Sequence, residues 1–336
     1  MNSISAPWHK RTSFRVAATI TLLLLCLSLV NPSELAQVLI HINLWLLLAA
    51  LLLNIIGTVL ARAWIAYLTT RASGLTLGFT ELVRINLIAR FYTIALPRGA
   101  SAAIRWHHYR KGGSGQAAAA LLIFENMVSI FTLFLSAGVI LSFETRQAGT
   151  SAQLLLPLAW LGALAAAMVL LPFMHQPSAR VFQNFLQPLL NRSGRIAKPI
   201  NKLLQAIQSY HDIPFRRVGS IFFVSLFGYA FFILSAFVLA EGMALGLSIA
   251  AIAWIRSITL LVALIPITIA GLGLREGALI ALLSDYGISA SAAFAYAITS
   301  FAIQLVLGLL GAILEAYRVL ITKEKTPIDE SNKEIT

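Results

Sequence analysis

The stretch PITIAGLGLREGAL, residues 266–279, places a proline, three glycines and an adjacent Arg-Glu pair inside a chain that is otherwise strongly apolar. Proline and glycine interrupt helices, and an arginine at the centre of a bilayer costs roughly 2.5 to 3.5 kcal/mol on insertion scales. Broken backbone is tolerated at membrane depth only where it lines a cavity or is buried in protein. We therefore expect Arg275 and Glu276 to belong to a buried structural or functional site.

The composition excludes an ordinary soluble fold. Of the 336 residues 59% are hydrophobic and 11% are charged, which indicates a polytopic membrane protein. The formal net charge of +12 is assigned to cytoplasmic loops rather than to a nucleic-acid surface. The single cysteine, Cys26, has no partner for an intrachain disulfide and lies in an apolar run, where it acts as a small hydrophobic residue.

Six segments have about the 20 apolar residues that a membrane span requires. We place them near residues 14–30, 38–60, 117–142, 153–173, 218–240 and 292–319. The predicted fold is an all-α, polytopic helix bundle in a single transmembrane domain over residues 1–322, followed by a disordered polar tail at 323–336. The 174–217 loop has two amphipathic stretches, which suit helices that lie on the anionic inner surface or that cap the bundle.

The charges of the loops predict the orientation, because Lys and Arg collect on the cytoplasmic side. Basic stretches, expected in the cytoplasm, are the N-terminus, 62–71, 98–111, 174–217 and the C-terminus. The opposite loops hold one Lys or Arg, Arg146, and are expected outside; they are 31–37, 143–152, 241–247 and 285–291. Both chain termini are therefore expected in the cytoplasm.

Two further apolar segments, 79–97 and 248–284, do not fit as single crossings, because each would place one flank on the wrong side. Re-entrant hairpins resolve this. The first would enter from the cytoplasm, and the second from the opposite face, turning back between Pro266 and Gly273. Paired interrupted segments of this kind are the sequence indication of a transporter site. Eight ordinary spans with weak breaks are the alternative.

The buried charges need partners or a function. Glu125 lies about eight residues into its span and is a candidate partner for one of the arginines Arg84, Arg90, Arg256 or Arg275. Arg275 and Glu276 are expected to seek separate partners, because neighbouring side chains on a helix point about 100° apart. A structural ion pair and direct contact with a substrate both remain open for these residues.

The glycines meet a different need. Gly271 and Gly273 allow a tight turn before a second half-helix that starts near Leu274. The free N–H groups and the positive dipole end of that half-helix would attract an anion, with phosphate as the obvious guest.

Enzymatic signatures are lacking in the sequence. The glycine spacing misses the dinucleotide-binding fingerprint by one residue, and no G-x-x-x-x-G-K loop for ATP occurs. The histidines show no metal-ligand spacing, and no nucleophile, acid or base can be named. We expect no cofactor, no metal and no catalytic activity, so that uphill transport would draw on an ion gradient or a partner.

Several of these residues resemble a known family. The segment from Pro97 to Arg105, the span with Glu125 and the GLGLREG motif at 271–277 look like the transmembrane region of lysylphosphatidylglycerol synthases and their stand-alone, flippase-like relatives. The likeness covers roughly residues 14–320. Two departures occur, since Ala102 replaces a common acidic residue and Asn126 replaces a common arginine.

The resemblance implies a polytopic core that moves or holds lipids, in the stand-alone form without the aminoacyl-transferase domain. We expect a lipid flippase or lipid-binding transporter of the bacterial cytoplasmic membrane, for an anionic phospholipid or a polyprenyl-phosphate-linked lipid. A scaffold that presents a lipid to a glycosyltransferase or a phospholipid-modifying enzyme is the alternative, and an integral-membrane transferase is a third possibility. The expected substrate-binding residues are Arg105, Glu125, Gly271, Gly273, Arg275, Glu276, Arg90 and Arg256.

Overall fold

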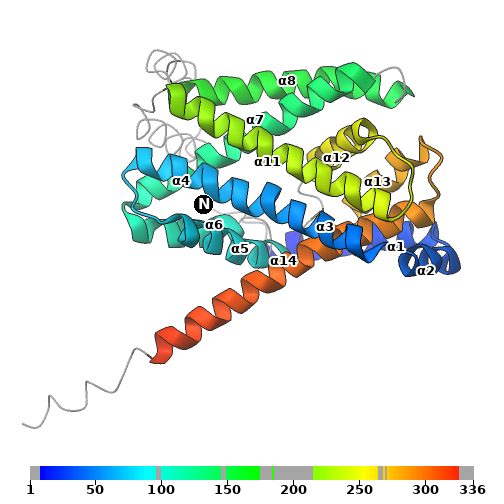
Figure 1. Cartoon of the computed structure of the whole chain (residues 1–336), viewed down its shortest axis with the longest axis horizontal. Coiled ribbons are helices and arrows are strands. Elements are labelled where there is room, and N and C mark those ends of the chain that lie inside the picture. The colour runs from blue at the N-terminus through cyan, green and yellow to red at the C-terminus, as the bar shows by residue number, and fades with distance from the viewer. Residues whose placement is uncertain are drawn as a thin grey trace, which may run out of the picture.

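The chain is described here from a computed structural model, which places residues 8–95, 100–144, 149–174, 184, 215–263, 268 and 271–324. Every element formed by these residues is a helix, which confirms the all-α class (Figure 1). Four helices are long and apolar enough to cross a membrane: Leu44–Arg71, Gly115–Phe143, Arg216–Gly242 and Ala290–Arg318. The protein is therefore a multi-pass membrane protein, although the predicted count of eight apolar segments is not reproduced as such.

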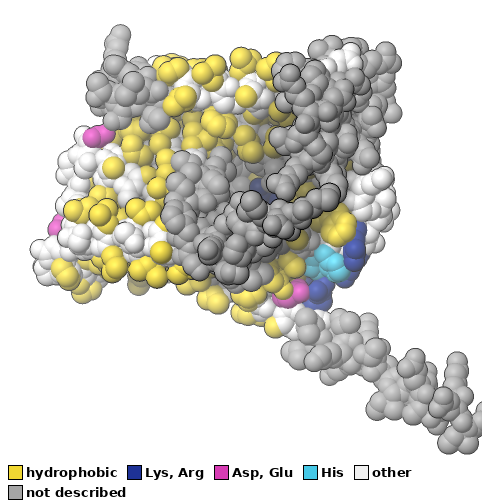
Figure 2. All heavy atoms as spheres, turned by 180° about the vertical axis from the view of Figure 1, so that it is seen from behind, with side chains coloured by type: hydrophobic (Ala, Val, Ile, Leu, Met, Phe, Trp, Pro, Cys, Tyr) yellow, Lys and Arg dark blue, Asp and Glu magenta, His cyan; other side chains and the backbone are white. Residues whose placement is uncertain are grey.

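The outer surface agrees with this class. On the face drawn in Figure 2, hydrophobic side chains cover most of the described surface, and basic and histidine side chains gather near one edge. Large apolar side chains are exposed along the helices, with Trp45 81% and Phe143 82% exposed. In water such a surface would aggregate, whereas lipid tails solvate it.

The N-terminal segment corrects the predicted start of the second span. Helix α1 (Trp8–Ser28) is followed by α2 (Pro32–Ile40), which is bent from it by 87°. The side chain of Asn31 accepts the N–H of Ser33, and Pro32 stands in the first turn of α2, where its missing N–H costs nothing. The prediction of a span from residue 38 is wrong, because residues up to Ile40 belong to α2.

The next span is longer than predicted. Asn43 caps helix α3 (Leu44–Ile55), which runs through a π-helical turn, η1 (Ile56–Leu60), into α4 (Ala61–Ser73). Gly74 ends α4 with φ 72°. The interpretation of 62–71 as a cytoplasmic loop is therefore wrong, because these residues continue the helix.

The first interrupted segment is a folded-back pair of helices, α5 (Phe79–Ala95) and α6 (Ala100–Tyr109). A single 3₁₀ turn, η2 (Arg110–Gly112), follows. The N–H of Thr76, just before α5, donates to the carbonyl of Gly112, just after α6, over 2.9 Å. The chain therefore enters and leaves this pair of helices at the same end. Within the predicted basic loop at 98–111, residues 100–111 are the returning helix and the turn after it, whereas residues 98 and 99 lie outside the described residues.

Three long helices form the middle of the described chain. Helices α7 (Gly115–Glu144) and α8 (Gly149–Met174) pack along each other, and α11 (Phe215–Gly242) packs against α3, η1 and α4. The predicted spans at 117–142 and 218–240 are confirmed, whereas the prediction at 153–173 corresponds to α8, of which Leu156–Leu171 is a shorter apolar helix. The predicted amphipathic loop at 174–217 lies almost wholly outside the described residues, and so does most of the tail at 323–336.

The second interrupted segment, like the first, consists of two short helices that pack against each other. Helices α12 (Ile249–Ala263) and α13 (Leu274–Ser284) pack against each other, and the indole of Trp254 in α12 donates to the hydroxyl of Tyr286 just after α13, over 2.6 Å. Helix α14 (Ala290–Glu324) then crosses under the bundle and packs on α5 and α13 (Figure 1).

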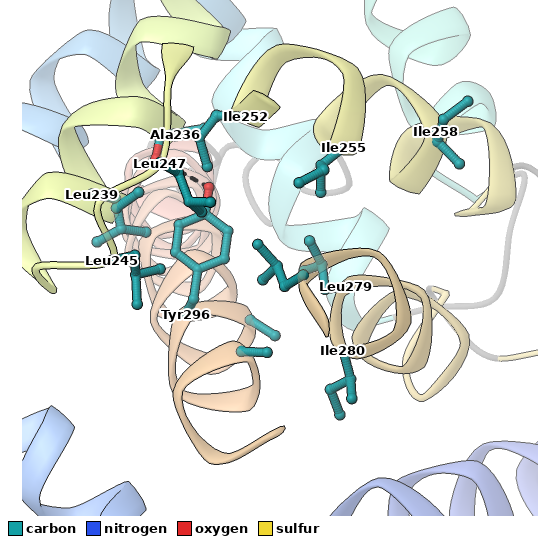
Figure 3. Packing of buried hydrophobic residues seen from close by; sticks show 14 of the residues in the cluster. Ala236, Leu239, Leu245, Leu247, Ile252, Ile255, Ile258, Leu279, Ile280 and Tyr296 are labelled. Atoms are coloured by element: carbon teal, nitrogen blue, oxygen red, sulfur yellow. Dashed lines mark hydrogen bonds between the residues drawn. The ribbon is translucent and has the colours of Figure 1, made fainter. Parts of the chain in front are cut away.

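Two buried apolar clusters hold the ends of the molecule. One joins α4, α5, α6 and α7, and the other joins α11, α12, α13 and α14. In the second, the ring of Tyr296 lies among side chains from three helices, and its hydroxyl donates to the carbonyl of Ala236 over 3.0 Å (Figure 3). Each folded-back pair is therefore anchored in its own apolar cluster. This anchoring fixes the positions of the polar residues that lie between the two clusters.

Candidate functional site

A cavity of about 500 Å³ lies where helices from both clusters meet. Its volume is within the range of pockets that bind small ligands. Five helices each contribute one arginine to the lining, and these are Arg62 (α4), Arg90 (α5), Arg105 (α6), Arg256 (α12) and Arg275 (α13). Among the described residues that line the cavity there is no carboxylate.

The π-helical turn helps to place Arg62. A Cβ added to Gly57 would lie 2.6 Å from the carbonyl oxygen of Gly228, so α11 approaches the turn at backbone distance. A π-turn holds one residue more than an α-turn and changes the direction of the side chains that follow it. Thr58, Ala61 and Arg62 all face the cavity in this arrangement.

Arg105 is held by Glu125. Its Nη1 lies 2.7 Å from Oε2 of Glu125, and the two side chains are 6% and 1% exposed. The hydroxyl of Tyr109, one turn further along α6, donates to the other carboxylate oxygen over 3.3 Å. The prediction that Glu125 pairs with Arg84, Arg90, Arg256 or Arg275 is therefore wrong, because α6 folds back beside α7 and brings Arg105 nearest.

Arg275 is held by its neighbour in sequence. Its Nε and Nη2 donate to Oε1 of Glu276 over 3.0 and 2.5 Å. The other oxygen of Glu276 accepts the N–H of Gly273 over 2.7 Å, so that this side chain caps the start of α13. The expectation of separate partners is wrong: the cap bends the Glu276 side chain back toward the helix start, within reach of Arg275.

The turn before α13 has the predicted conformation, but it packs against α1 instead of facing the cavity. Gly271 and Gly273 have φ of 77° and 81°, which favour glycine. A Cβ on Gly273 would meet the Cβ of Leu22 at 2.6 Å, so the turn packs on α1. Neither glycine lines the cavity, and Glu276 already accepts the Gly273 N–H.

Arg256 is the least compensated of the five. The residue is 7% exposed, and its Nε and Nη1 are buried without a hydrogen-bond partner in the described structure. Its guanidinium carbon lies 5.1 Å from the ring centre of Phe232, a contact worth about 0.5 to 2 kcal/mol. That contact falls short of the several kcal/mol that an unpaired buried charge costs.

Arg90 and Arg62 also lack a carboxylate. Arg90 donates to the side-chain oxygen of Gln304 in α14, a neutral acceptor that leaves the charge uncompensated. No ion pair joins Arg62 to a described residue. Three of the five guanidinium groups therefore face the cavity without an ion pair to a described residue, although Glu125 and Glu276 lie near enough to attract Arg62 and Arg256.

The hydroxyl groups of the lining offer few free donors. The side chains of Thr58, Thr93, Ser129 and Thr259 each donate to the carbonyl oxygen four residues earlier in their own helix. Apart from the hydroxyl of Ser101, guanidinium N–H groups are thus the main donors left for a guest. A cavity with donors and no carboxylate suits an acceptor-rich anion.

The sequence prediction of the site is met in part by this arrangement. Arg90, Arg105, Arg256 and Arg275 come together at one cavity, whereas Glu125 and Glu276 stand behind two of them. Arg62 was missed, because its basic neighbours indicated a loop. The small and polar face formed by Gly57, Thr58 and Ala61 was the signal that the helix continues into a packed interior.

A second polar group lies at the end of α6. Nη1 of Arg318 in α14 is 3.3 Å from Nδ1 of His108, and Nη2 of Arg318 is 2.8 Å from Glu315. Burial and the charge of Arg318 lower the pKa of His108 from 6.5 to about 4. His108 is therefore neutral at physiological pH and accepts from Arg318.

Comparison with known proteins agrees with these features. The model of the family described as the lysylphosphatidylglycerol synthase TM region matches residues 13–311, which include all five cavity arginines. No curated protein matches the chain significantly. Since the family model covers most of the chain, the protein belongs to the family of the lysylphosphatidylglycerol synthase transmembrane region.

Proposed function

We propose that the protein is a lipid flippase or lipid-binding transporter that receives an anionic headgroup in the five-arginine cavity. The observation that carries this proposal is the presence of three carboxylate-free arginines, led by the buried Arg256, in one cavity of an apolar bundle. Buried charge of one sign is costly, and an anionic guest would offset that cost. The headgroup would be that of an anionic phospholipid or a polyprenyl-phosphate-linked lipid.

The two folded-back pairs support a transport role. In the proposed topology α5–α6 enters from the cytoplasm and α12–α13 from the opposite side of the bacterial cytoplasmic membrane, with both termini cytoplasmic. The cavity is lined by both pairs, so that small movements of either pair would expose it to one side at a time. Acyl chains would stay in the bilayer while the headgroup passes.

The two carboxylates have a positioning role in this proposal. Glu125 and Glu276 hold Arg105 and Arg275 by charge-assisted hydrogen bonds. They leave the other N–H groups of these arginines available to a phosphate oxygen. Arg62, Arg90 and Arg256 would contact the headgroup directly.

Reconstitution into phosphatidylcholine vesicles tests the proposal. The probe is phosphatidylglycerol with a fluorescent acyl chain, and the readout is the fraction bleached by an impermeant reductant in the outer leaflet. We expect the wild-type protein to expose nearly all of the probe with time. Arg256→Gln and Arg90→Gln should slow this about tenfold or more, since a hydrogen bond to a charged group contributes roughly 1.5 to 3 kcal/mol.

Arg71→Gln is the matched control, because Arg71 is exposed on α4 and contacts Tyr67 outside the cavity. It should transport at the wild-type rate. Equal rates for the cavity variants and the wild type would remove the proposed site. Tight binding of phosphatidylglycerol without any bleaching beyond the outer leaflet would favour the scaffold that presents a lipid to an enzyme.

A further inference from the structure

The charge of the cavity is larger than a single phosphodiester neutralises. Five arginines line it, and the two nearby carboxylates, Glu125 and Glu276, each pair with one of them. Within the described residues this leaves an excess of three positive charges on Arg62, Arg90 and Arg256. A phosphatidylglycerol headgroup brings a single negative charge, so most of the excess would stay buried and uncompensated.

The arginines form two groups. Arg62, Arg90 and Arg105 line the cavity from α4, α5 and α6, and α5 packs against both α4 and α6. Arg256 and Arg275 line it from α12 and α13, which pack against each other. Each group has one arginine with a carboxylate partner and at least one without. The cavity therefore offers two positions for an anionic group, one on each pair.

The lining also discriminates against amino groups. No described lining residue carries a carboxylate, the amide oxygen of Gln304 already accepts from Arg90, and the amide of Asn86 is neutral. An ammonium group needs such acceptors, and near these arginines it would meet like charge. A lysyl ester on the headgroup, which adds ammonium groups, is therefore the wrong chemistry for this cavity.

We propose that the substrate is a lipid whose headgroup carries two phosphate groups and no amino group. One phosphate lies against Arg62 and Arg90, and the other against Arg256 and Arg275. Both a diphosphate and a pair of phosphodiesters have this chemistry. The proposal rests on the proposed function, since it takes the cavity as the headgroup site.

Binding to the purified full chain in neutral detergent at one fixed salt concentration tests it. The probes are phosphatidylglycerol, cardiolipin, farnesyl diphosphate, pyrophosphate and lysylphosphatidylglycerol, and calorimetry gives each Kd. We expect cardiolipin or farnesyl diphosphate to bind about tenfold or more tightly than phosphatidylglycerol, and lysylphosphatidylglycerol to bind weakest. Arg62→Gln and Arg256→Gln should each reduce the two-phosphate preference to near unity, and Arg71→Gln should keep it.

The outcomes separate the two proposals. Equal affinities for one-phosphate and two-phosphate lipids, or tight binding of lysylphosphatidylglycerol, would overturn the two-phosphate headgroup and leave the lipid site intact. Binding of pyrophosphate as tight as that of farnesyl diphosphate would overturn the lipid assignment. Binding of none of the anionic lipids would overturn both. A melting curve for each variant excludes misfolding, and Arg256→Lys, which keeps the charge, should retain part of the preference.

Discussion

Arg105 lies 2.7 Å from Glu125, with both side chains almost fully buried, whereas Arg256 faces the same cavity with two nitrogens unpartnered in the described structure. The first arginine is neutralised by the protein, and the second is not. Because buried charge without a partner is costly, the cavity stores unfavourable energy in the ligand-free state. An anion bound in the cavity would release this energy, which is the physical basis of the headgroup site that we propose.

The Arg105–Glu125 pair should be essential to stability. Glu125→Gln leaves the guanidinium of Arg105 buried without a counter-charge, so we expect a loss of about 3 to 5 kcal/mol in the free energy of unfolding. Denaturant unfolding in detergent measures it. Glu315→Gln is the control, because its pair with Arg318 is only partly buried, at 15% and 28% exposure, and should lose less than the buried pair. A similar loss in both variants would argue against a special role for the buried pair.

Replacing Arg256 should affect stability and function in opposite directions. Arg256→Met removes an uncompensated buried charge and loses the contact with Phe232, which contributes only about 0.5 to 2 kcal/mol. We expect the melting temperature of the ligand-free protein to stay level or rise while lipid transport falls. A large drop in melting temperature would mean that Arg256 has a structural partner.

The crossing of α14 over α5 depends on Gly311. A Cβ there would lie 2.0 Å from the carbonyl oxygen of Leu87, so Gly311→Ala must push two backbones apart. We expect a loss of about 1 to 3 kcal/mol. Gly308→Ala, one turn earlier, meets the end of the Ile94 side chain, which can move, and should be nearly neutral. Equal unfolding free energies for both variants would contradict the close crossing.

The turn before α13 should tolerate no side chain at Gly273. Gly273→Ala combines a φ of 81° with a Cβ 2.6 Å from that of Leu22. Gly287→Ala has a φ of 73° but nothing within 4 Å. Both should lose about 1 to 2 kcal/mol from backbone strain, and Gly273→Ala about 1 to 3 kcal/mol more from overpacking. Thermal unfolding of the two variants measures these losses. Equal losses would show that α1 does not pack closely against the turn.

His108 should make stability depend on pH. Its pKa in the folded protein is about 4, below the ordinary 6.5, because of burial and the charge of Arg318. Between these two values the unfolded chain binds more protons, so stability falls as the pH is lowered through this window. The difference in melting temperature between wild type and His108→Gln should therefore shrink from pH 6.5 to 4. His107→Gln, at an exposed position, should change this difference little, and a difference that stays constant for His108→Gln would contradict the prediction.

Periodicity and composition were sufficient to predict the helices. Apolar runs identified the segments that became α7, α8, α11 and α14, and the breaks near Pro97 and Pro266 identified the two folded-back pairs. The boundaries failed where polar caps and basic residues compete with the apolar pattern. Asn31 and Asn43 start new helices inside an apolar stretch, and Arg62 lies in a helix although basic residues in sequence suggest a loop.

The pairing of the buried charges could not be predicted from periodicity and composition. A helical period of 3.6 residues gives the direction of a side chain about its own helix axis, but not which helix lies opposite. Glu125 was therefore assigned to several arginines and not to Arg105. Separate partners were predicted for Arg275 and Glu276 from the ideal 100° angle, because the hydrogen bond from the Gly273 N–H that bends Glu276 back can be identified only once the turn is known.

The sequence by itself determined that this chain is an all-helical membrane protein with arginines in two interrupted segments, because apolar length and the cost of buried charge are local properties. Only the tertiary structure decided that five arginines share one cavity and that two of them are neutralised. Helix crossings at backbone distance, such as that of Gly57 with Gly228, set these positions. The net charge of a cavity depends on distances between residues far apart in the chain, and these distances exist only in the folded bundle.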